Sequence, residues 1–269
     1  MDVGISTASF YPEYLTEETI PFIGEMGINT IEVFLESYSE YGLDYCKRMK
    51  DTLDKYNIIP YSVHALGSQF EPQLFAATER QRNDAKKLYE KVLKAANILG
   101  AKVYVFHGPP INKNKLPVLD FEKIGKITSE LSDMAGQYDI RFSWENVFWC
   151  WFSFPEFAKN LVQASNSKNL YFTFDIKQAM KSRKDPMDFL KAMGNKITNV
   201  HLCDFDDRGK LYLPGEGSFD FKVLKYNLDI IGYKGPVIME VYRFNYNHYK
   251  EMLNSIKFLK NIFEKEMDM

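Results

Sequence analysis

Seven acidic or imidazole side chains stand at or near the ends of short apolar runs in this chain. Glu145 ends "FSWE", Asp175 ends "YFTFD", and three of the four histidines end an apolar run in the same way. Asp175 alone could cap the helix that follows it. A carboxylate flanked by strand residues, however, is costly to bury unless a cation meets it. The set is Glu32, His64, His107, Glu145, Asp175, His201 and Glu240.

Eight β-type runs alternate with segments of helical periodicity. The runs begin at Val3, Asn29, Ile59, Lys102, Ile140, Leu170, Ile197 and Pro236. Most are nearly continuous in apolar or aromatic residues, which favours a parallel sheet that is covered on both faces. The segments between them carry apolar residues spaced three or four apart, and Gly27, Gly100 and Gly232 stand where three of these helices are expected to end.

This alternation predicts a single-domain (β/α)8 TIM barrel over residues 1–269, because no Pro/Gly/Ser-rich linker or charge block marks a domain boundary. A doubly wound open sheet is the alternative, but the first turn, "STASFYPEY", lacks the glycines of a dinucleotide fingerprint. In a barrel, the last four strands would bring Glu145, Asp175, His201 and Glu240 to one side of the mouth. Three carboxylates and one imidazole suit a single divalent metal ion, with Mn²⁺ or Mg²⁺ favoured and Co²⁺ or Zn²⁺ as alternatives.

Composition narrows the classes of partner. The net charge of -2 provides no basic surface for a polyanion, so we expect no nucleic-acid partner. The three cysteines, Cys46, Cys150 and Cys203, lie far apart, which argues against a disulfide framework and favours a reducing cytoplasm. Without a signal peptide or 18 consecutive apolar residues, we expect neither secretion nor a membrane span.

The order of several short motifs resembles the xylose isomerase-like barrel superfamily, in its sugar phosphate isomerase/epimerase group. These motifs are "GINTIEV" through Glu32, "WEN" at Glu145, "FDIKQ" at Asp175, "HLCD" at His201, the turn "LPGEGSFDF", and "MEVY" at Glu240. The resemblance covers nearly the whole chain. It implies that Glu145, Asp175, His201 and Glu240 bind one divalent metal, and that the two glutamates act as acid and base on opposite faces of the substrate.

The activity implied by the resemblance is that of a metal-dependent isomerase or epimerase of a sugar or sugar phosphate. A bound metal would act as a Lewis acid and stabilise the enediolate that forms when the C–H next to a carbonyl loses its proton. The sequence does not choose between isomerisation and epimerisation. A dehydratase of a cyclic polyol ketone of the inosose type and a non-catalytic sugar-binding barrel are the alternatives.

Two positions depart from the family pattern. Gln178 stands where the family frequently has a histidine, and glutamine can hydrogen-bond a hydroxyl but does not titrate near neutral pH. Gly209 stands in "DDRGK", where the apurinic-endonuclease branch has a zinc-ligating histidine. The loss of both histidines argues against a three-zinc endonuclease.

Further residues are expected to contact substrate around the cluster. His64 and His107 would face substrate oxygens, with a structural hydrogen bond in the barrel as the alternative. In the aromatic loop "NVFWCWFSFPEF", Trp149 and Trp151 are candidate pocket walls for the C–H face of a sugar. A helix anchor or a subunit contact is the alternative for the two tryptophans, so a homo-oligomer stays open. The substrate-binding set is completed by Glu32, Gln178 and Arg208, the last as a candidate for a phosphate or hydroxyl.

Overall fold

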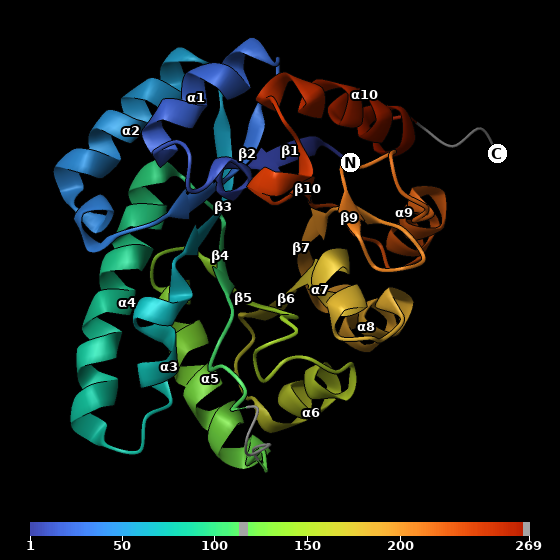
Figure 1. Cartoon of the computed structure of the whole chain (residues 1–269). Coiled ribbons are helices and arrows are strands. Elements are labelled where there is room, and N and C mark those ends of the chain that lie inside the picture. The colour runs from blue at the N-terminus through green and yellow to red at the C-terminus, as the bar shows by residue number, and fades with distance from the viewer. Residues whose placement is uncertain (113–117, 266–269) are drawn as a thin grey trace.

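Eight parallel strands form a closed barrel in the order β1-β10-β7-β6-β5-β4-β3-β2 (Figure 1). The computed structural model describes residues 1–112 and 118–265. The barrel strands are β1 (Val3–Ser6), β2 (Thr30–Leu35), β3 (Ile59–Ala65), β4 (Val103–Phe106), β5 (Arg141–Glu145), β6 (Leu170–Asp175), β7 (Ile197–Leu202) and β10 (Val237–Met239). Each predicted run overlaps one of them, so the prediction of a (β/α)8 TIM barrel is confirmed.

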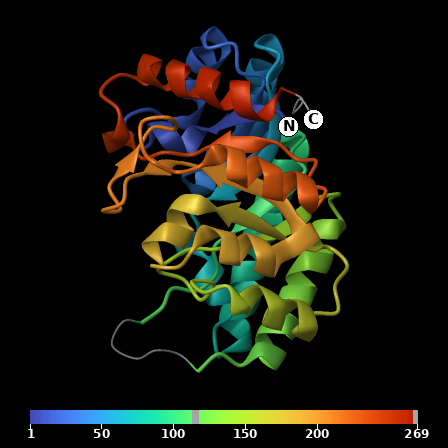
Figure 2. The same ribbon diagram turned by 90° about the vertical axis from the view of Figure 1, so that its right-hand side faces the viewer.

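Helices surround the barrel on its outside, as Figures 1 and 2 show. The longer ones are α1 (Thr16–Glu25), α2 (Leu43–Lys55), α4 (Glu79–Leu99), α5 (Phe121–Gly136), α6 (Glu156–Ala164), α8 (Pro186–Met193), α9 (Phe221–Ile230) and α10 (Met252–Phe263). Two short helices, α3 (Glu71–Leu74) and α7 (Ile176–Lys181), follow β3 and β6. Short 3₁₀ helices are η1 (Thr7–Phe10), η2 (Tyr38–Tyr41), η3 (Gly67–Gln69), η4 (Gly194–Lys196), η5 (Arg243–Asn245) and η6 (Tyr249–Glu251).

The ends of the helices follow the glycine pattern. Gly100 caps α4 in the left-handed conformation, with φ of 87°, and its N–H donates to Asn97 O. Gly27 and Gly232 also have positive φ, 68° and 72°. Only glycine adopts this conformation without a steric penalty, so the chain can turn sharply from helix into strand at these positions.

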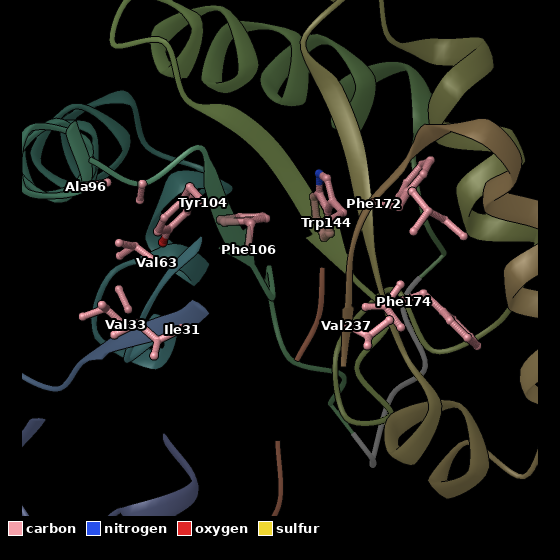
Figure 3. Close-up of a cluster of buried hydrophobic side chains, with 14 of the residues drawn as sticks. Ile31, Val33, Val63, Ala96, Tyr104, Phe106, Trp144, Phe172, Phe174 and Val237 are labelled. Carbon is pink, nitrogen blue, oxygen red and sulfur yellow. The ribbon is translucent and has the colours of Figure 1, made fainter. Parts of the chain in front are cut away.

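Along each strand, alternate residues face the helices and the barrel interior. Val63, Trp144 and Phe172 are fully buried in the apolar layer under the helices (Figure 3). In the interior, Glu32 on β2 hydrogen-bonds Asn199 and His201 on β7, although β2 and β7 are not neighbours in the barrel. Asn199 and His201 both point inward because residues two apart on a strand share a face, so the interior of the barrel is polar at this level.

A small antiparallel hairpin, β8 (Asp204–Phe205) with β9 (Leu211–Tyr212), follows β7 and was not predicted. Figure 2 shows this hairpin on the side of the barrel opposite the N-terminus. Asp204 accepts hydrogen bonds from the backbone N–H groups of Gly215, Gly217 and Phe219. Asp204 therefore holds the "PGEGSF" segment in its turn through these three backbone hydrogen bonds.

The two ends of the described chain meet at the end of the barrel away from the β8–β9 hairpin. The amino group of Met1 donates to Phe263 O, so α10 packs beside β1 and completes the ring of helices. Cys46, Cys150 and Cys203 are buried and free of disulfides, as expected. Among residues 1–112 and 118–265, we find no helix whose length and hydropathy would let it cross a bilayer.

Candidate metal centre and active site

Four side chains converge at the carboxyl ends of β5, β6, β7 and β10. One ligand atom from each of Glu145, Asp175, His201 and Glu240 lies within 4.8 Å of the other three. His201 Nδ1 lies 2.6 Å from Glu240 Oε2, 3.3 Å from Glu145 Oε1 and 3.8 Å from Asp175 Oδ2. Glu240 keeps 13% of its side chain exposed, whereas the others are buried. The barrel thus gathers the four residues that the sequence singled out as metal ligands.

The donor set of this cluster fits a divalent cation. Asp175 Oδ2 is buried and has no hydrogen-bond partner among the residues that the structure describes. Three carboxylates held this close repel one another, and a shared cation would remove that repulsion. Carboxylate oxygens with one imidazole nitrogen are ligands that Mn²⁺, Mg²⁺, Co²⁺ and Zn²⁺ accept.

The two carboxylate oxygens of Asp175 have different surroundings. Its Oδ1 accepts the N–H of Gln178 at 2.8 Å and caps α7, while its Oδ2 faces the cluster. Asn146, next to Glu145, holds the backbone of Asp175 through two hydrogen bonds of 2.8 Å. The side-chain oxygen of Asn146 accepts the Asp175 N–H, and its amide donates to the Asp175 carbonyl. The "WEN" motif therefore positions two candidate ligands at once.

Asn146→Ala is expected to weaken Mn²⁺ binding about 10-fold or more, since loss of a residue that orients a ligand typically has this effect. Stability should fall by about 1–3 kcal/mol because buried backbone groups lose their partners. Mn²⁺ titration and urea unfolding measure the two effects. Asn169→Ala is the matched control, because Asn169 also donates to two backbone carbonyls, those of Ser132 and Ile140. Equal Mn²⁺ affinity in the two variants would contradict the role of Asn146.

His201 is oriented from below by Glu32. His201 Nε2 lies 2.9 Å from Glu32 Oε2, which leaves Nδ1 facing the cluster. Glu32 is fully buried and also accepts from Ser62 Oγ at 2.7 Å, Asn199 Nδ2 at 3.0 Å and Ser6 Oγ at 3.2 Å. Glu32 was predicted as a substrate contact. Its side chain points into the barrel from β2 and lies against His201 Nε2. A carboxylate in this position fixes the tautomer and the ring orientation of a histidine ligand.

The two candidate acid/base glutamates each have a separate cationic partner. Burial by itself would raise the pKa of Glu145, but His107 and His201 hold that pKa well below its ordinary value. Burial acts in the same direction on Glu240, where Lys177 and His201 hold the pKa below its ordinary value. Both glutamates are therefore ionised at neutral pH and can bind a cation or accept a proton.

The two histidines beside the cluster differ in their bonding. His107 Nε2 lies 2.7 Å from Glu145 Oε2; burial would lower the pKa of His107, but Glu145 raises it to about 9. The His64 ring lies 4.3 Å from the His107 ring, and burial together with His107 lowers the pKa of His64 to about 4. With this low pKa, His64 is neutral near pH 7 and its buried ring nitrogens have no partner among the described residues, whereas His107 pairs with Glu145.

The aromatic loop after β5 divides its side chains between the site and the core. Trp149 lies edge-on to His107, with ring centroids 5.9 Å apart. Trp151 packs instead on Phe75, with ring centroids 5.3 Å apart, and its backbone N–H donates to Pro109 O. The anchoring alternative therefore describes Trp151, and only Trp149 of the two predicted pocket walls lies beside the site. Residues two apart would share a side in an extended segment, but Trp149 stands in a turn closed by the backbone hydrogen bond from Cys150 N–H to Val147 O, and this turn separates the two side chains.

The two remaining predicted substrate contacts, Gln178 and Arg208, lie in different surroundings. Gln178 is 7% exposed, and its Oε1 accepts the N–H of Phe148 at 3.5 Å. Arg208 is exposed in the turn between β8 and β9, where its backbone N–H donates to Asp206 Oδ1. Arg208 thus stands at the surface of the hairpin, where a substrate would have to meet it from solvent.

Sequence reasoning missed Lys177. Its side chain is 1% exposed, and its Nζ lies 3.4 Å from Asp175 Oδ2 and 3.3 Å from Glu240 Oε1. A lysine in the first turn of a helix is usually solvated, so the sequence carries no mark of this buried position. Asn199 was also missed, although the sequence offers a signal for it. It stands two residues before His201 and therefore shares the inward face of β7 with that histidine.

Glu71 was missed as well. This carboxylate on α3 is fully buried and accepts from Tyr104 Oη at 2.6 Å and from the backbone N–H groups of His107 and Gly108, both at 3.0 Å. It therefore fixes the start of the loop that carries His107. Burial raises the pKa of Glu71 to about 7.

The raised pKa of Glu71 predicts a pH-dependent stability. Between pH 4.5, the ordinary pKa, and about pH 7, the folded state binds more protons at Glu71 than the unfolded chain does. The stability that Glu71 contributes is thus present below pH 4.5 and is lost as the pH rises through 7. Relative to Glu71→Gln, the wild type should lose about 3 kcal/mol across this window.

Urea unfolding of both proteins over this pH range measures the difference. Glu122→Gln, at an exposed glutamate of α5, is the control and should give a curve parallel to that of the wild type. A parallel curve for Glu71→Gln as well would contradict the prediction.

A closed parallel barrel with three carboxylates and a histidine at its carboxyl end defines a TIM-barrel protein with a candidate metal centre. The chain belongs to the xylose isomerase-like TIM barrel family, whose model matches residues 21–262. The resemblance drawn from the motifs is thereby confirmed.

The chain is similar to proteins of other organisms, among them an inosose isomerase. That protein, from Bacillus velezensis, is 26% identical over 235 residues, which cover 79% of this chain and 83% of its own length. An uncharacterized protein of Methanocaldococcus jannaschii is 27% identical over 254 residues, covering 89% of this chain and 83% of the relative.

Solved structures agree with the fold. A D-tagatose 3-epimerase-like protein superposes with a TM-score of 0.80 at 26% identity, covering 98% of this chain and 97% of that one. The IOLI protein with a bound zinc atom has a TM-score of 0.80 at 20% identity, with both chains covered completely, which shows a shared fold.

Proposed function

We propose that the protein is a divalent-metal-dependent isomerase or epimerase of a sugar or sugar phosphate, acting by removal of the proton next to a carbonyl. The observation that carries this proposal is the meeting of two ionised glutamates, Glu145 and Glu240, in one candidate metal cluster. The likeness to an inosose isomerase and to a D-tagatose 3-epimerase-like protein supports the same class of reaction.

Glu145, Asp175, His201 and Glu240 would hold the ion. A divalent ion held there would act as a Lewis acid that polarises a substrate carbonyl. The oxygen-rich donor set favours Mn²⁺ or Mg²⁺. Co²⁺ and Zn²⁺ are the alternatives, and the zinc of the IOLI protein is an instance of a divalent ion bound to a barrel of this fold.

The chain's own groups would move the proton. Glu145 comes from β5 and Glu240 follows β10, so the two carboxylates approach the cluster from different strands. One glutamate would take the proton from one face of the substrate, and the other would return a proton from the opposite face. His107, 2.7 Å from Glu145 Oε2, would hold that carboxylate in place.

Other residues would bind and orient the sugar. Both ring nitrogens of His64 are unpaired within residues 1–112 and 118–265, and His64 would bond a substrate hydroxyl. Trp149, beside His107, would cover the C–H face of the sugar and exclude water. Gln178 and Arg208 are the further candidates, the latter for a phosphate or an outer hydroxyl of the substrate.

Deuterium uptake tests the proposal. The Mn²⁺-loaded protein, incubated in D₂O with ketohexoses, their phosphates and inososes, should place deuterium next to the carbonyl of its substrate. Mass spectrometry would also separate isomerisation, which keeps the substrate mass apart from the label, from dehydration, which loses water. Binding of these sugars without any exchange would favour a non-catalytic sugar-binding barrel.

A further inference from the structure

The side chain of Lys177 places a positive charge inside the acidic cluster. Asp175 caps α7, and the first turn of this helix directs Lys177 back into the barrel. Its ammonium lies 3.4 Å from Asp175 Oδ2 and 3.3 Å from Glu240 Oε1, and 4.7 Å from the centre of the Tyr242 ring. Only 1% of the side chain is exposed, so the ammonium contacts no bulk solvent.

The two carboxylate oxygens of Glu240 have different partners, one of which is Lys177. Glu240 Oε1 faces the ammonium, whereas Oε2 lies 2.6 Å from His201 Nδ1, on the side of the candidate ligand atoms. An ion pair on one oxygen restricts rotation of the carboxylate. Lys177 therefore determines which oxygen of Glu240 is presented to the centre of the cluster.

Lys177 also changes the charge balance. The three carboxylates of the cluster carry three negative charges. A divalent ion alone compensates two of them. The ammonium of Lys177 adds positive charge beside Asp175 and Glu240, as His107 does beside Glu145. Since Glu145, Asp175 and His201 are buried, uncompensated charge at the cluster would be costly.

We propose that Lys177 is a positioning residue that fixes Glu240 and acts as a second, permanent cation, which limits the affinity of the site for a divalent metal. This inference rests on the metal site proposed above. An ammonium that shares Asp175 and Glu240 with a divalent ion repels that ion at short range. The lysine thus lowers metal affinity while it keeps Glu240 in its working orientation.

Lys177→Gln is the test, with Mn²⁺ titration of the whole protein as the main readout. The variant should bind Mn²⁺ at least about 10-fold more tightly than the wild type, because a repelling charge is gone. Turnover should fall in the same variant, because Glu240 is no longer held. A change of packing alone would not raise affinity and lower turnover together.

Lys181→Gln is the matched control. Lys181 lies over the same Tyr242 ring, at 4.4 Å, and its Nζ donates to Tyr242 Oη at 3.2 Å. The ion pairs with Asp175 and Glu240 belong to Lys177, so the control should change Mn²⁺ affinity by less than about threefold.

Unchanged or weaker Mn²⁺ binding by Lys177→Gln would overturn the inference, and unchanged turnover would overturn the positioning role. If the variant unfolds without metal, Mn²⁺ should restore its fold by replacing the lost charge. A variant that stays unfolded at saturating Mn²⁺ also contradicts the inference. A wild-type protein that binds no Mn²⁺, Mg²⁺, Co²⁺ or Zn²⁺ would instead refute the metal site itself.

Discussion

Glu145→Gln and Glu240→Gln should each lower turnover by about a thousandfold or more. Glutamine keeps the size of the side chain, but it cannot accept the proton that leaves the substrate. The loss should appear in both product formation and deuterium uptake, because both require the same proton transfer. Since the two glutamates would act from opposite faces, neither can replace the other.

The assay needs saturating metal, because both glutamates are also candidate ligands. Mn²⁺ occupancy is therefore measured on each variant before turnover is compared. Glu216→Gln, at an exposed glutamate of the turn after β9, is the matched control and should keep the activity of the wild type. Substantial turnover by either variant at full occupancy would remove the acid/base assignment.

Removal of the metal should abolish solvent exchange and destabilise the protein. Without a divalent ion, the three carboxylates of the cluster face one another, with His107, His201 and Lys177 as the neighbouring cations. An ion that binds only the folded state, present at about 100 times its Kd, adds about 3 kcal/mol to the free energy of unfolding. Melting temperature should therefore rise with Mn²⁺ concentration.

Elemental analysis of active protein purified without chelator should find one ion per chain. Dialysis against a chelator should then stop deuterium uptake, and Mn²⁺ should restore it. Asp175→Asn is the companion variant, because it removes a candidate ligand charge while its side-chain oxygen can still cap α7. Full activity of metal-free protein would refute a metal-dependent mechanism.

The strands and the four candidate ligands could be predicted because both depend on local pattern. Apolar runs such as "LYFTFD" indicate strands by themselves, and a residue at the end of a barrel strand must stand at the mouth. Once eight such runs are recognised, closure of the barrel brings Glu145, Asp175, His201 and Glu240 together.

Other residues had roles that no local pattern reveals. The burial of Lys177 depends on the direction of the first turn of α7, and the role of Glu71 depends on its contact with a loop more than 30 residues away. Trp149 and Trp151 have the same chemistry and stand two residues apart, yet one lies beside His107 and the other packs on Phe75.

By itself, therefore, the sequence determined the alternation of strands and helices, the (β/α)8 class and the identity of the four clustered side chains. Only the tertiary structure decided that Glu32 orients His201 from below, that His107 pairs with Glu145, and that Lys177 enters the cluster. The physical reason is that periodicity fixes which residues share a face of an element. Charge pairing across the barrel depends on the depth and direction of side chains from distant segments.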